Sequence, residues 1–281
     1  ISIHRIVYTI TPQKKRGRIK AAFYFRQHRI MGQKQLCAAF IVRRCLYYCP
    51  SFVVCLQKKA PHGASEKAHR QVTDMYFAYG EKELAYLRRK DKRLCEVIDR
   101  IGHIDRAVDT DLFSSVVHHI IGQQISTKAQ ATIWQRMQDA LGQVNAETIL
   151  AAGVPRLQAL GISFRKAEYI TDLAEKVCTG AFDLDAVAHM SDEDAIRALS
   201  SLKGIGVWTA EMILLFCLQR PDVFSYDDLA IQRGLRMVYH HRRIDRKLFD
   251  RYRRRFSPYC SVASLYLWAV AGGAIPELRE I

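Results

Sequence analysis

Two glycines that flank one apolar residue, Gly204-Ile205-Gly206, form the first pattern in the chain with chemical meaning. Glycine lets the backbone turn tightly and approach a partner closely. The segment that follows has a helical pattern, so its first N–H groups and its positive dipole end would point at the turn. A phosphate is the natural ligand for this arrangement, and such a grip is independent of base sequence. An ordinary helix–helix turn is the alternative, and the two glycines alone do not exclude it.

The elements that would position this turn are predicted to be helices. Apolar residues recur near the 3.6-residue period over 109–123, and Ser126 is placed as the N-cap of a helix over 127–140. Further helices are expected over 146–152, 164–178, 192–199, 208–218, 228–239, 246–256 and 261–271. Alternating runs rich in Val, Ile and Thr are missing. We therefore predict an all-α fold with two helical lobes, because a single bundle rarely uses this many short helices.

The basic charge of the chain is concentrated at its start. The net charge of +15 and the pI near 9.6 would normally indicate a polyanionic partner. However, residues 1–74 carry 15 Lys and Arg with only Glu66 and Asp74 as acids, whereas residues 75–281 carry 28 bases and 26 acids. The bulk charge is therefore weak support for nucleic-acid binding by the larger segment.

The first 74 residues do not have the pattern of a folded domain. An apolar stretch over 36–56 is broken by two arginines and a proline, which argues against a membrane span of about 20 apolar residues. The Arg-rich composition is also found in transit peptides, although this stretch is long and aromatic for one. Balanced charge and helical periodicity begin at Met75. We expect 1–74 to be a disordered or non-native upstream extension, and 75–281 to form the domain.

The eight cysteines do not form a zinc-binding pattern. Neither the four before residue 75 nor the four after it include the closely spaced CxxC pairs of such a site. The later four lie in helical-looking stretches and are expected to be buried free thiols in a reducing compartment.

Four separated segments together resemble the helix-hairpin-helix DNA glycosylase superfamily, and within it the DNA-3-methyladenine glycosylase II (alkylpurine) family. They are IGQQISTKA at 121–129, LGISFRKA at 160–167, LKGIGVWTA at 202–210 and RPDVFSYDDLAIQR at 220–233. The resemblance covers roughly residues 75–281. It implies two lobes with a cleft between them, and a base excision repair enzyme that flips alkylated purines such as 3-methyladenine out of DNA and hydrolyses their N-glycosidic bond.

The resemblance also implies a catalytic aspartate five residues before an arginine, a spacing shared by Asp228 and Arg233. We assign Asp227 to the N-cap of the following helix, and a capping or ion-paired role is the alternative for Asp228. Breaking the bond to an alkylated purine builds positive charge on the deoxyribose. A fixed carboxylate stabilises that charge and can orient the attacking water.

A cationic base is held well by electron-rich ring faces. Trp208 matches a base-pocket position of the family, Tyr259 lies near another, and Met212 follows Trp208 by one helical turn. Core packing is the alternative for each. Bifunctional relatives have at position 208 a lysine that forms a Schiff base and cleaves the strand. Lys203 does not match that position, so we expect a monofunctional enzyme without strong abasic-site lyase activity.

The remaining contacts with DNA are also implied by the resemblance. A wedge that fills the gap left by the flipped base is expected from Gln124 or Ile125, and a hydrogen bond within the lobe is the alternative for the neighbouring Gln123. The residues expected to contact DNA at the hairpin are Gly204, Gly206 and Thr209.

No cofactor is expected to be required. Main-chain oxygens of Ser200, Leu202 and Ile205 match those that hold a structural Na⁺ or K⁺ in such hairpins. Related iron–sulfur enzymes carry four closely spaced cysteines near the C-terminus, whereas this tail has only Cys260, so no cluster is expected. The adjacent histidines at 118–119 lack a ligand partner at i+4 and are expected to be structural.

The expected partner is double-stranded DNA that contains damaged bases. No membrane is expected as a partner, and the protein is expected to be a monomer. The protein would act in the bacterial cytoplasm with the nucleoid, or in a eukaryotic nucleus. Two alternatives stay open: a glycosylase of the same fold for uracil, hypoxanthine or mismatched bases, and a non-catalytic DNA-binding protein. The stretch at 224–228 lacks the proline or valine often found before the aspartates, so the lesion range is open as well.

Overall fold

The computed structural model describes residues 76–280. The expected upstream extension at 1–74 and the expected start at Met75 lie outside these residues. The described part contains twelve helices and no strand, and its only β pairing is an isolated bridge between Tyr76 and Ala107. The predicted all-α class is therefore confirmed for this part of the chain.

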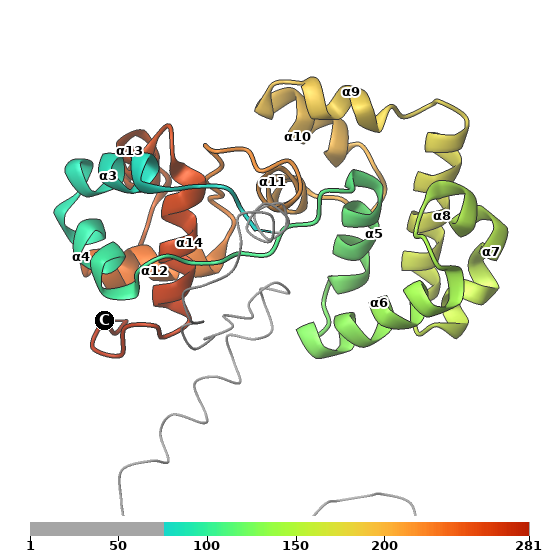
Figure 1. Cartoon of the computed structure of the whole chain (residues 1–281), viewed down its shortest axis with the longest axis horizontal. Coiled ribbons are helices and arrows are strands. Elements are labelled where there is room, and N and C mark those ends of the chain that lie inside the picture. Colours follow the sequence, from blue (N-terminus) through green and yellow to red (C-terminus); the bar gives the residue numbers. More distant parts are fainter. Residues whose placement is uncertain (1–75, 281) are drawn as a thin grey trace, which may run out of the picture.

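The helices form two lobes (Figure 1). They are α3 (Glu81–Lys90), α4 (Lys92–Ile101), α5 (Leu112–Gly122), α6 (Thr127–Leu141), α7 (Ala146–Ala159), α8 (Phe164–Cys178), α9 (Leu184–His189), α10 (Asp192–Ser200), α11 (Val207–Phe216), α12 (Leu229–Tyr239), α13 (Arg246–Phe256) and α14 (Cys260–Ala271). One lobe contains α3, α4, α12, α13 and α14, and the other contains α5 to α10. Helix α11 lies between them.

Helix α14 is the centre of the first lobe. All of its residues are buried, and it packs against α3, α4, α12 and α13. A helix that is apolar on every side belongs in the interior. Gly234 lets α12 approach it closely, because a Cβ at that position would lie 2.4 Å from the carbonyl oxygen of Leu267.

Helix α11 contacts both lobes, since its last residue, Phe216, packs against Trp268 of α14 with 5.3 Å between ring centroids. Seven of its residues are buried, and it packs against α10 and α5 of the second lobe. Its C-terminal end is tied to the chain that leads into α5, because the Asp109 N–H donates to the Phe216 carbonyl at 3.1 Å. Its N-terminal end follows the Gly204–Gly206 turn, so the same helix carries the turn and the inter-lobe contact.

Most expected helix ranges agree with the structure, and Ser126 caps α6 by accepting the Ala129 N–H at 3.2 Å. The helix expected to end at residue 152 is longer than predicted. The chain kinks at Gly153, where φ is +67°, and helix resumes through Pro155 to Ala159. Helices α3 and α4 and the short α9 lie outside the expected ranges.

The expectation of buried thiols is half correct. Cys217 and Cys260 are buried, but Cys95 is half-buried and Cys178 is exposed at the end of α8. In the described part of the chain, no helix combines the length and the apolar composition that crossing a bilayer would require.

Candidate active site

Asp228 is a buried carboxylate at the start of α12, with 2% of its surface exposed. Its Oδ1 accepts the N–H groups of Ala230 and Ile231, both at 2.9 Å. The N-cap role that we assigned to Asp227 therefore belongs to Asp228, and the assignment was wrong by one residue. The capping alternative for Asp228 is correct, but it accounts for only one of the two carboxylate oxygens.

Two tryptophans complete the surroundings of this carboxylate. The Trp208 indole N–H donates to Oδ2 at 3.0 Å, and the Trp268 indole N–H donates to Oδ1 at 3.1 Å. Four neutral N–H donors thus hold Asp228, and an ionised carboxylate is the side chain that accepts from all of them without donating. Rotation of the carboxylate would break bonds to α11, α12 and α14 together, so its orientation is fixed.

Trp268 is not among the site residues expected from the sequence. This residue lies in the wholly buried α14 and stacks near Phe216, with ring centroids 5.3 Å apart. Its apolar surroundings indicate core packing. The available signal was weaker: a buried indole N–H usually finds an acceptor, and the acceptor here is Asp228.

Trp208 lies where an aromatic pocket wall is expected. It is half-buried, it is the second residue of α11, and its indole N–H contacts the carboxylate directly. Lys203, by contrast, directs its ammonium to Asp172 on α8, with 2.6 Å between Nζ and Oδ1. That carboxylate raises the pKa of Lys203. Lys203 is therefore bound as a cation away from Asp228.

The other two expected pocket residues, Met212 and Tyr259, make no described contact with the Asp228 carboxylate. Met212 is 2% exposed and part of the core, which favours the packing alternative. Tyr259 is half-buried and packs edge-to-face against Tyr86 of α3, with 5.2 Å between ring centroids. Their roles in a pocket, and the expected cleft between the lobes, stay predictions.

A second carboxyl group near Asp228 was missed. Glu211 lies one turn after Trp208 on α11 and accepts a short hydrogen bond from the buried Ser225 hydroxyl. Burial raises the pKa of Glu211, the Ser225 hydrogen bond lowers it, and the charges of Asp227 and Asp228 raise it further. A glutamate inside an apolar run carries no sequence motif that would mark it.

The two glycines of the hairpin differ, and only Gly204 is required by the backbone and its surroundings. Gly204 has φ of +81°, and a Cβ there would lie 2.3 Å from the Tyr169 ring. Gly206 is the N-cap of α11 and provides no side-chain cap, with open space where a Cβ would be. The first N–H groups of α11 therefore lack intrahelical acceptors. The Thr209 side chain is buried, so only its main chain is available to a phosphate there.

The loop expected to supply the wedge is tied to this hairpin. Gln123 donates its side-chain amide to the Gly204 carbonyl at 2.7 Å, so the internal hydrogen bond given as its alternative is present. Gln124 is exposed and has φ of +57°, an uncommon conformation for a residue with a side chain. Ile125 is half-buried against the core. Of the two wedge candidates, Gln124 is the one that projects.

Lys166 of α8 holds the same loop from behind. Its ammonium donates to the carbonyls of Ile121 at 2.9 Å and Gln123 at 2.6 Å. Partial burial lowers the pKa of Lys166. Lys166 belongs to the LGISFRKA motif at 160–167, but nothing in the sequence pattern indicates this contact.

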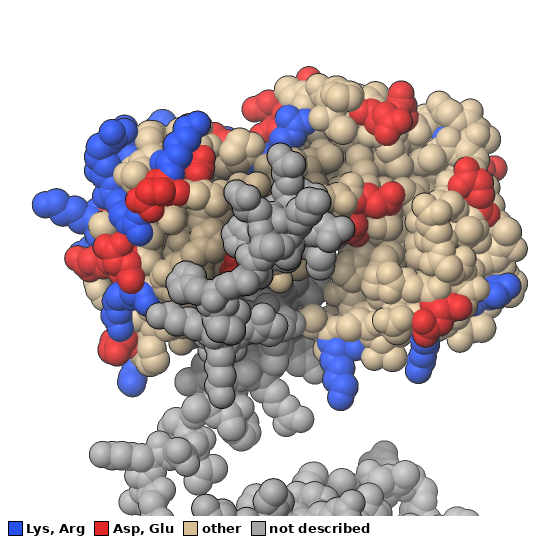
Figure 2. Space-filling model, viewed as in Figure 1, with Lys and Arg blue, Asp and Glu red and all other residues tan. Residues whose placement is uncertain are grey.

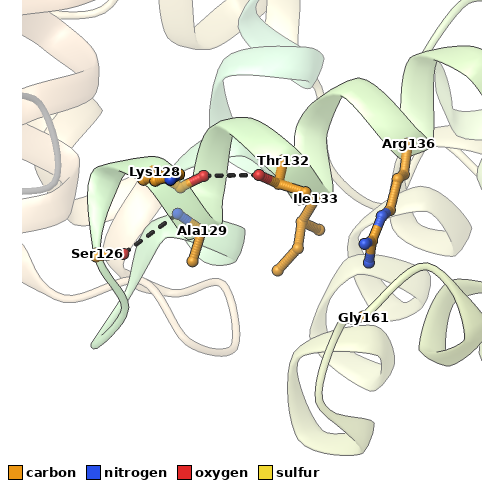
Figure 3. A pocket seen from close by; sticks show the side chains of 7 residues that line it. All are labelled: Ser126, Lys128, Ala129, Thr132, Ile133, Arg136 and Gly161. Atoms are coloured by element: carbon orange, nitrogen blue, oxygen red, sulfur yellow. Dashed lines mark hydrogen bonds between the residues drawn. The ribbon is translucent and has the colours of Figure 1, made fainter. Parts of the chain in front are cut away.

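A groove of about 440 Å³ begins beside the loop, along one face of α6 (Figure 3). Arg136 extends along it toward Gly161, and Lys128 lies near its Ser126 end. The groove does not include Asp228 or Trp208. It is therefore a surface next to the candidate wedge and not the candidate base pocket.

The cation site expected at the main-chain oxygens of Ser200, Leu202 and Ile205 lies at the end of α10 and in the turn between α10 and α11. The Ser200 hydroxyl is buried without a hydrogen-bond partner, and the Leu202 carbonyl accepts the Ile205 N–H at 3.1 Å. The Ser200 hydroxyl is not one of the expected main-chain ligands, so the cation site stays a prediction.

Several known proteins are similar to this chain in sequence and fold. The family model described as HhH-GPD superfamily base excision DNA repair protein matches residues 117–258. A Bacillus subtilis protein whose name provisionally assigns it as a DNA-3-methyladenine glycosylase is 31% identical over 173 residues, which are 57% of this chain and 59% of that protein. This chain thus spans less than two thirds of that relative's length.

Two solved structures are also similar. A DNA-3-methyladenine glycosidase from Bacillus halodurans has 34% identity and a TM-score of 0.65, over 73% of this chain and 96% of that one. A Schizosaccharomyces pombe 3-methyladenine DNA glycosylase in complex with abasic DNA has 26% identity and a TM-score of 0.61, over 68% and 96%. The family match spans about half of this chain and includes the hairpin and Asp228. The chain therefore belongs to the helix-hairpin-helix (HhH-GPD) superfamily of base excision DNA repair proteins.

Proposed function

We propose that this protein is a monofunctional DNA glycosylase that hydrolyses the N-glycosidic bond of alkylated purines, 3-methyladenine among them, in double-stranded DNA. The observation that carries the proposal is the Asp228 carboxylate, which four neutral N–H groups hold in one orientation beside the Trp208 ring. The names of the Bacillus halodurans and Schizosaccharomyces pombe structures support the substrate class.

The chemistry follows from the charge of the damaged base. Alkylation of a ring nitrogen makes the purine cationic, so it leaves as a neutral molecule while positive charge builds on the deoxyribose. The Asp228 carboxylate would stabilise that charge and orient the water that attacks the sugar. Its fixed orientation means that little reorganisation is needed at the moment of reaction. The Trp208 face would hold the cationic base before it leaves.

DNA would be held by groups outside this centre. The free N–H groups at the start of α11 are suited to one phosphate, a grip that does not read bases. Gln124, exposed on a loop joined to that hairpin, would fill the gap left by the flipped base. The partner would accordingly be double-stranded DNA that contains damaged bases, and we expect a monomer to suffice.

Strand cleavage is not part of the proposal. A lyase needs an amine that can reach the sugar carbon, and the group bonded to Asp228 on this side is the Trp208 indole. Ser200, Leu202 and Ile205 would hold a Na⁺ or K⁺ that stiffens the hairpin, without a part in bond cleavage.

The test is base release from duplexes that each contain one lesion: 3-methyladenine, 7-methylguanine, hypoxanthine, uracil or a mismatch. We expect methylated purines to be released fastest, leaving alkali-labile abasic sites and no cleaved strands before alkali treatment. Binding without release of any base would support the non-catalytic alternative. Faster release of uracil or hypoxanthine would support a different substrate class on the same fold.

A further inference from the structure

The described chain divides its charge between two ends. Residues 81–101 and 236–256 together carry 16 Lys and Arg and 7 acids, whereas residues 107–220 carry 9 bases and 13 acids. The first two ranges include α3, α4 and α13, and α3 packs against both α4 and α13. Figure 2 shows Lys and Arg gathered at this end, the left of the view. We call the surface of 81–101 and 236–256 the basic face.

Most cations of the basic face have no acidic partner. Ten of its sixteen Lys and Arg form no ion pair with any described residue. The six that do are Arg88, Arg100, Arg236, Arg246, Arg253 and Arg255. Like charges held close together repel one another and destabilise the compact state. A surface of this kind is suited to a polyanion, which would remove the repulsion.

A hollow of about 260 Å³ lies within the basic face. Its lining combines four cations with one acid and one tyrosine: Lys90, Asp91, Lys92, Arg93, Tyr239 and Arg255. The acid is already satisfied, since Asp91 lies 2.5 Å from an Arg255 guanidinium nitrogen and caps the Leu94 N–H at 2.9 Å. The hollow is therefore net positive, with Lys90 and Lys92 exposed at its rim.

The hydroxyl of Tyr239 provides a second, independent indication of a ligand. It is buried in the wall of this hollow and makes no hydrogen bond of good geometry, although the residue is only 8% exposed. A poorly satisfied buried hydroxyl costs free energy. Burial raises the pKa of Tyr239, and the charge of Asp91 and a side-chain contact with it raise the pKa further, so the hydroxyl keeps its proton and can donate. A donor in a hollow lined by four cations is complementary to an anionic oxygen, which would compete with Asp91 for this proton.

We propose that the basic face is a second DNA-binding surface, which holds the phosphate backbone of undamaged duplex while Tyr239, Lys90 and Lys92 take one phosphate in the hollow. Lys, Arg and Tyr contacts with phosphate carry no base information. Helix α14 separates this face from the hairpin that precedes α11 (Figure 1). The face can therefore bind DNA that does not occupy the Asp228 site, which would keep the protein on DNA during its search for lesions.

The first experiment measures binding of the full chain to an undamaged duplex at several salt concentrations. Each lost phosphate contact lowers the slope of log affinity against log salt by about 0.9. Because Lys90 and Lys92 share one phosphate, the double variant Lys90→Gln with Lys92→Gln should lower the slope by about 0.9. The control is Lys176→Gln with Arg197→Gln, which removes the same charge from the other lobe. It should leave the slope unchanged, and both double variants should keep the single-turnover rate of base release.

A second variant separates binding from folding. Tyr239→Phe removes the hydroxyl and keeps the ring, so the affinity for duplex should fall about tenfold, as expected for one hydrogen bond to a charged group. The unfolding temperature should hold or rise, because a poorly satisfied buried group is removed. A purely structural role would instead lower the unfolding temperature and leave the affinity unchanged.

Three results would overturn the proposal. The first is a salt slope that is unchanged in the Lys90/Lys92 variant, and the second is an equal decrease of the slope in the control variant. The third is a Lys90/Lys92 variant that no longer binds an RNA duplex but still binds the DNA duplex. The last result would assign the face to RNA. None of these measurements depends on base release, so failure here is distinguishable from failure of the proposed function.

Discussion

Replacement of Asp228 by Asn is the most informative single change at the site, because the structure assigns the two carboxylate oxygens to different partners. Oδ1 accepts from Ala230, Ile231 and Trp268, and an Asn oxygen can keep all three bonds. The Asn NH₂ group would then face the Trp208 N–H, where two donors meet. The lost bond should cost about 1–2 kcal/mol of stability, at the low end of the range for an unsatisfied donor, because the half-buried Trp208 can reach water.

The effect on catalysis should be larger than the effect on folding. The variant lacks the negative charge that is proposed to face the sugar cation, and removal of one preorganised electrostatic group typically costs 10²- to 10³-fold in rate, or about 3–4 kcal/mol. Affinity for DNA should stay within about threefold, since the hairpin N–H groups are separate from the carboxylate. The assay is single-turnover release of a methylated purine with enzyme in excess, together with thermal unfolding and binding to an abasic duplex.

Asp227→Asn is the matched control. Asp227 is exposed and adjacent in sequence, so the same loss of charge should change the rate by less than tenfold. The reasoning is refuted if Asp228→Asn keeps a rate within threefold of the parent. It is also refuted if the two variants lose activity equally, since a general change of local charge would then explain the loss.

Three further predictions concern the supporting structure. Gly204→Ala should destabilise the fold by about 2 kcal/mol or more, because of its positive φ and the close Tyr169 ring, whereas Gly206→Ala should change thermal unfolding little because nothing lies near its Cβ position. Lys166→Met should leave two loop carbonyls without a donor and reduce base release about tenfold at saturating enzyme, with binding to an abasic duplex retained; unchanged release would exclude a role for the loop. Burial lowers the pKa of His118 to about 4, so the unfolded state binds more protons between pH 6.5 and 4. The stability present above pH 6.5 should fall by up to about 3 kcal/mol across that window, and a pH series of denaturant titrations should show a flatter profile for His118→Gln.

The sequence predicted the helices well where apolar periodicity was uninterrupted and capping residues were clear. It was less accurate where two physical signals compete at neighbouring positions. Asp227 and Asp228 are equally good N-caps by residue type, and only the start of α12 at Leu229 shows which one the helix uses. Gly153 has the features of a helix end, but the chain resumes helix immediately after it.

Contacts between distant segments could not be predicted from local patterns. Trp268 lies 40 residues after Asp228 and inside an apolar helix, so nothing near it marks a bond to a carboxylate. The basic face is a similar case. Residues 75–281 are nearly neutral when counted along the sequence, yet folding brings two basic segments more than a hundred residues apart onto one end of the molecule.

The contacts of Gln123 imply that the hairpin and the wedge loop act as one unit. Its amide holds the Gly204 carbonyl, while its own carbonyl is held by Lys166. A phosphate bound at the hairpin would therefore fix the position of Gln124, without an intervening flexible segment. The buried Asp228 is joined to the same helix α11 through Trp208. In the proposed function, backbone grip, gap filling and charge stabilisation would thus share one connected frame, so a base that is not flipped would leave Gln124 in conflict with an intact stack. Discrimination between damaged and normal bases would then come partly from the energy of unstacking, which is lowest for a weakened base pair.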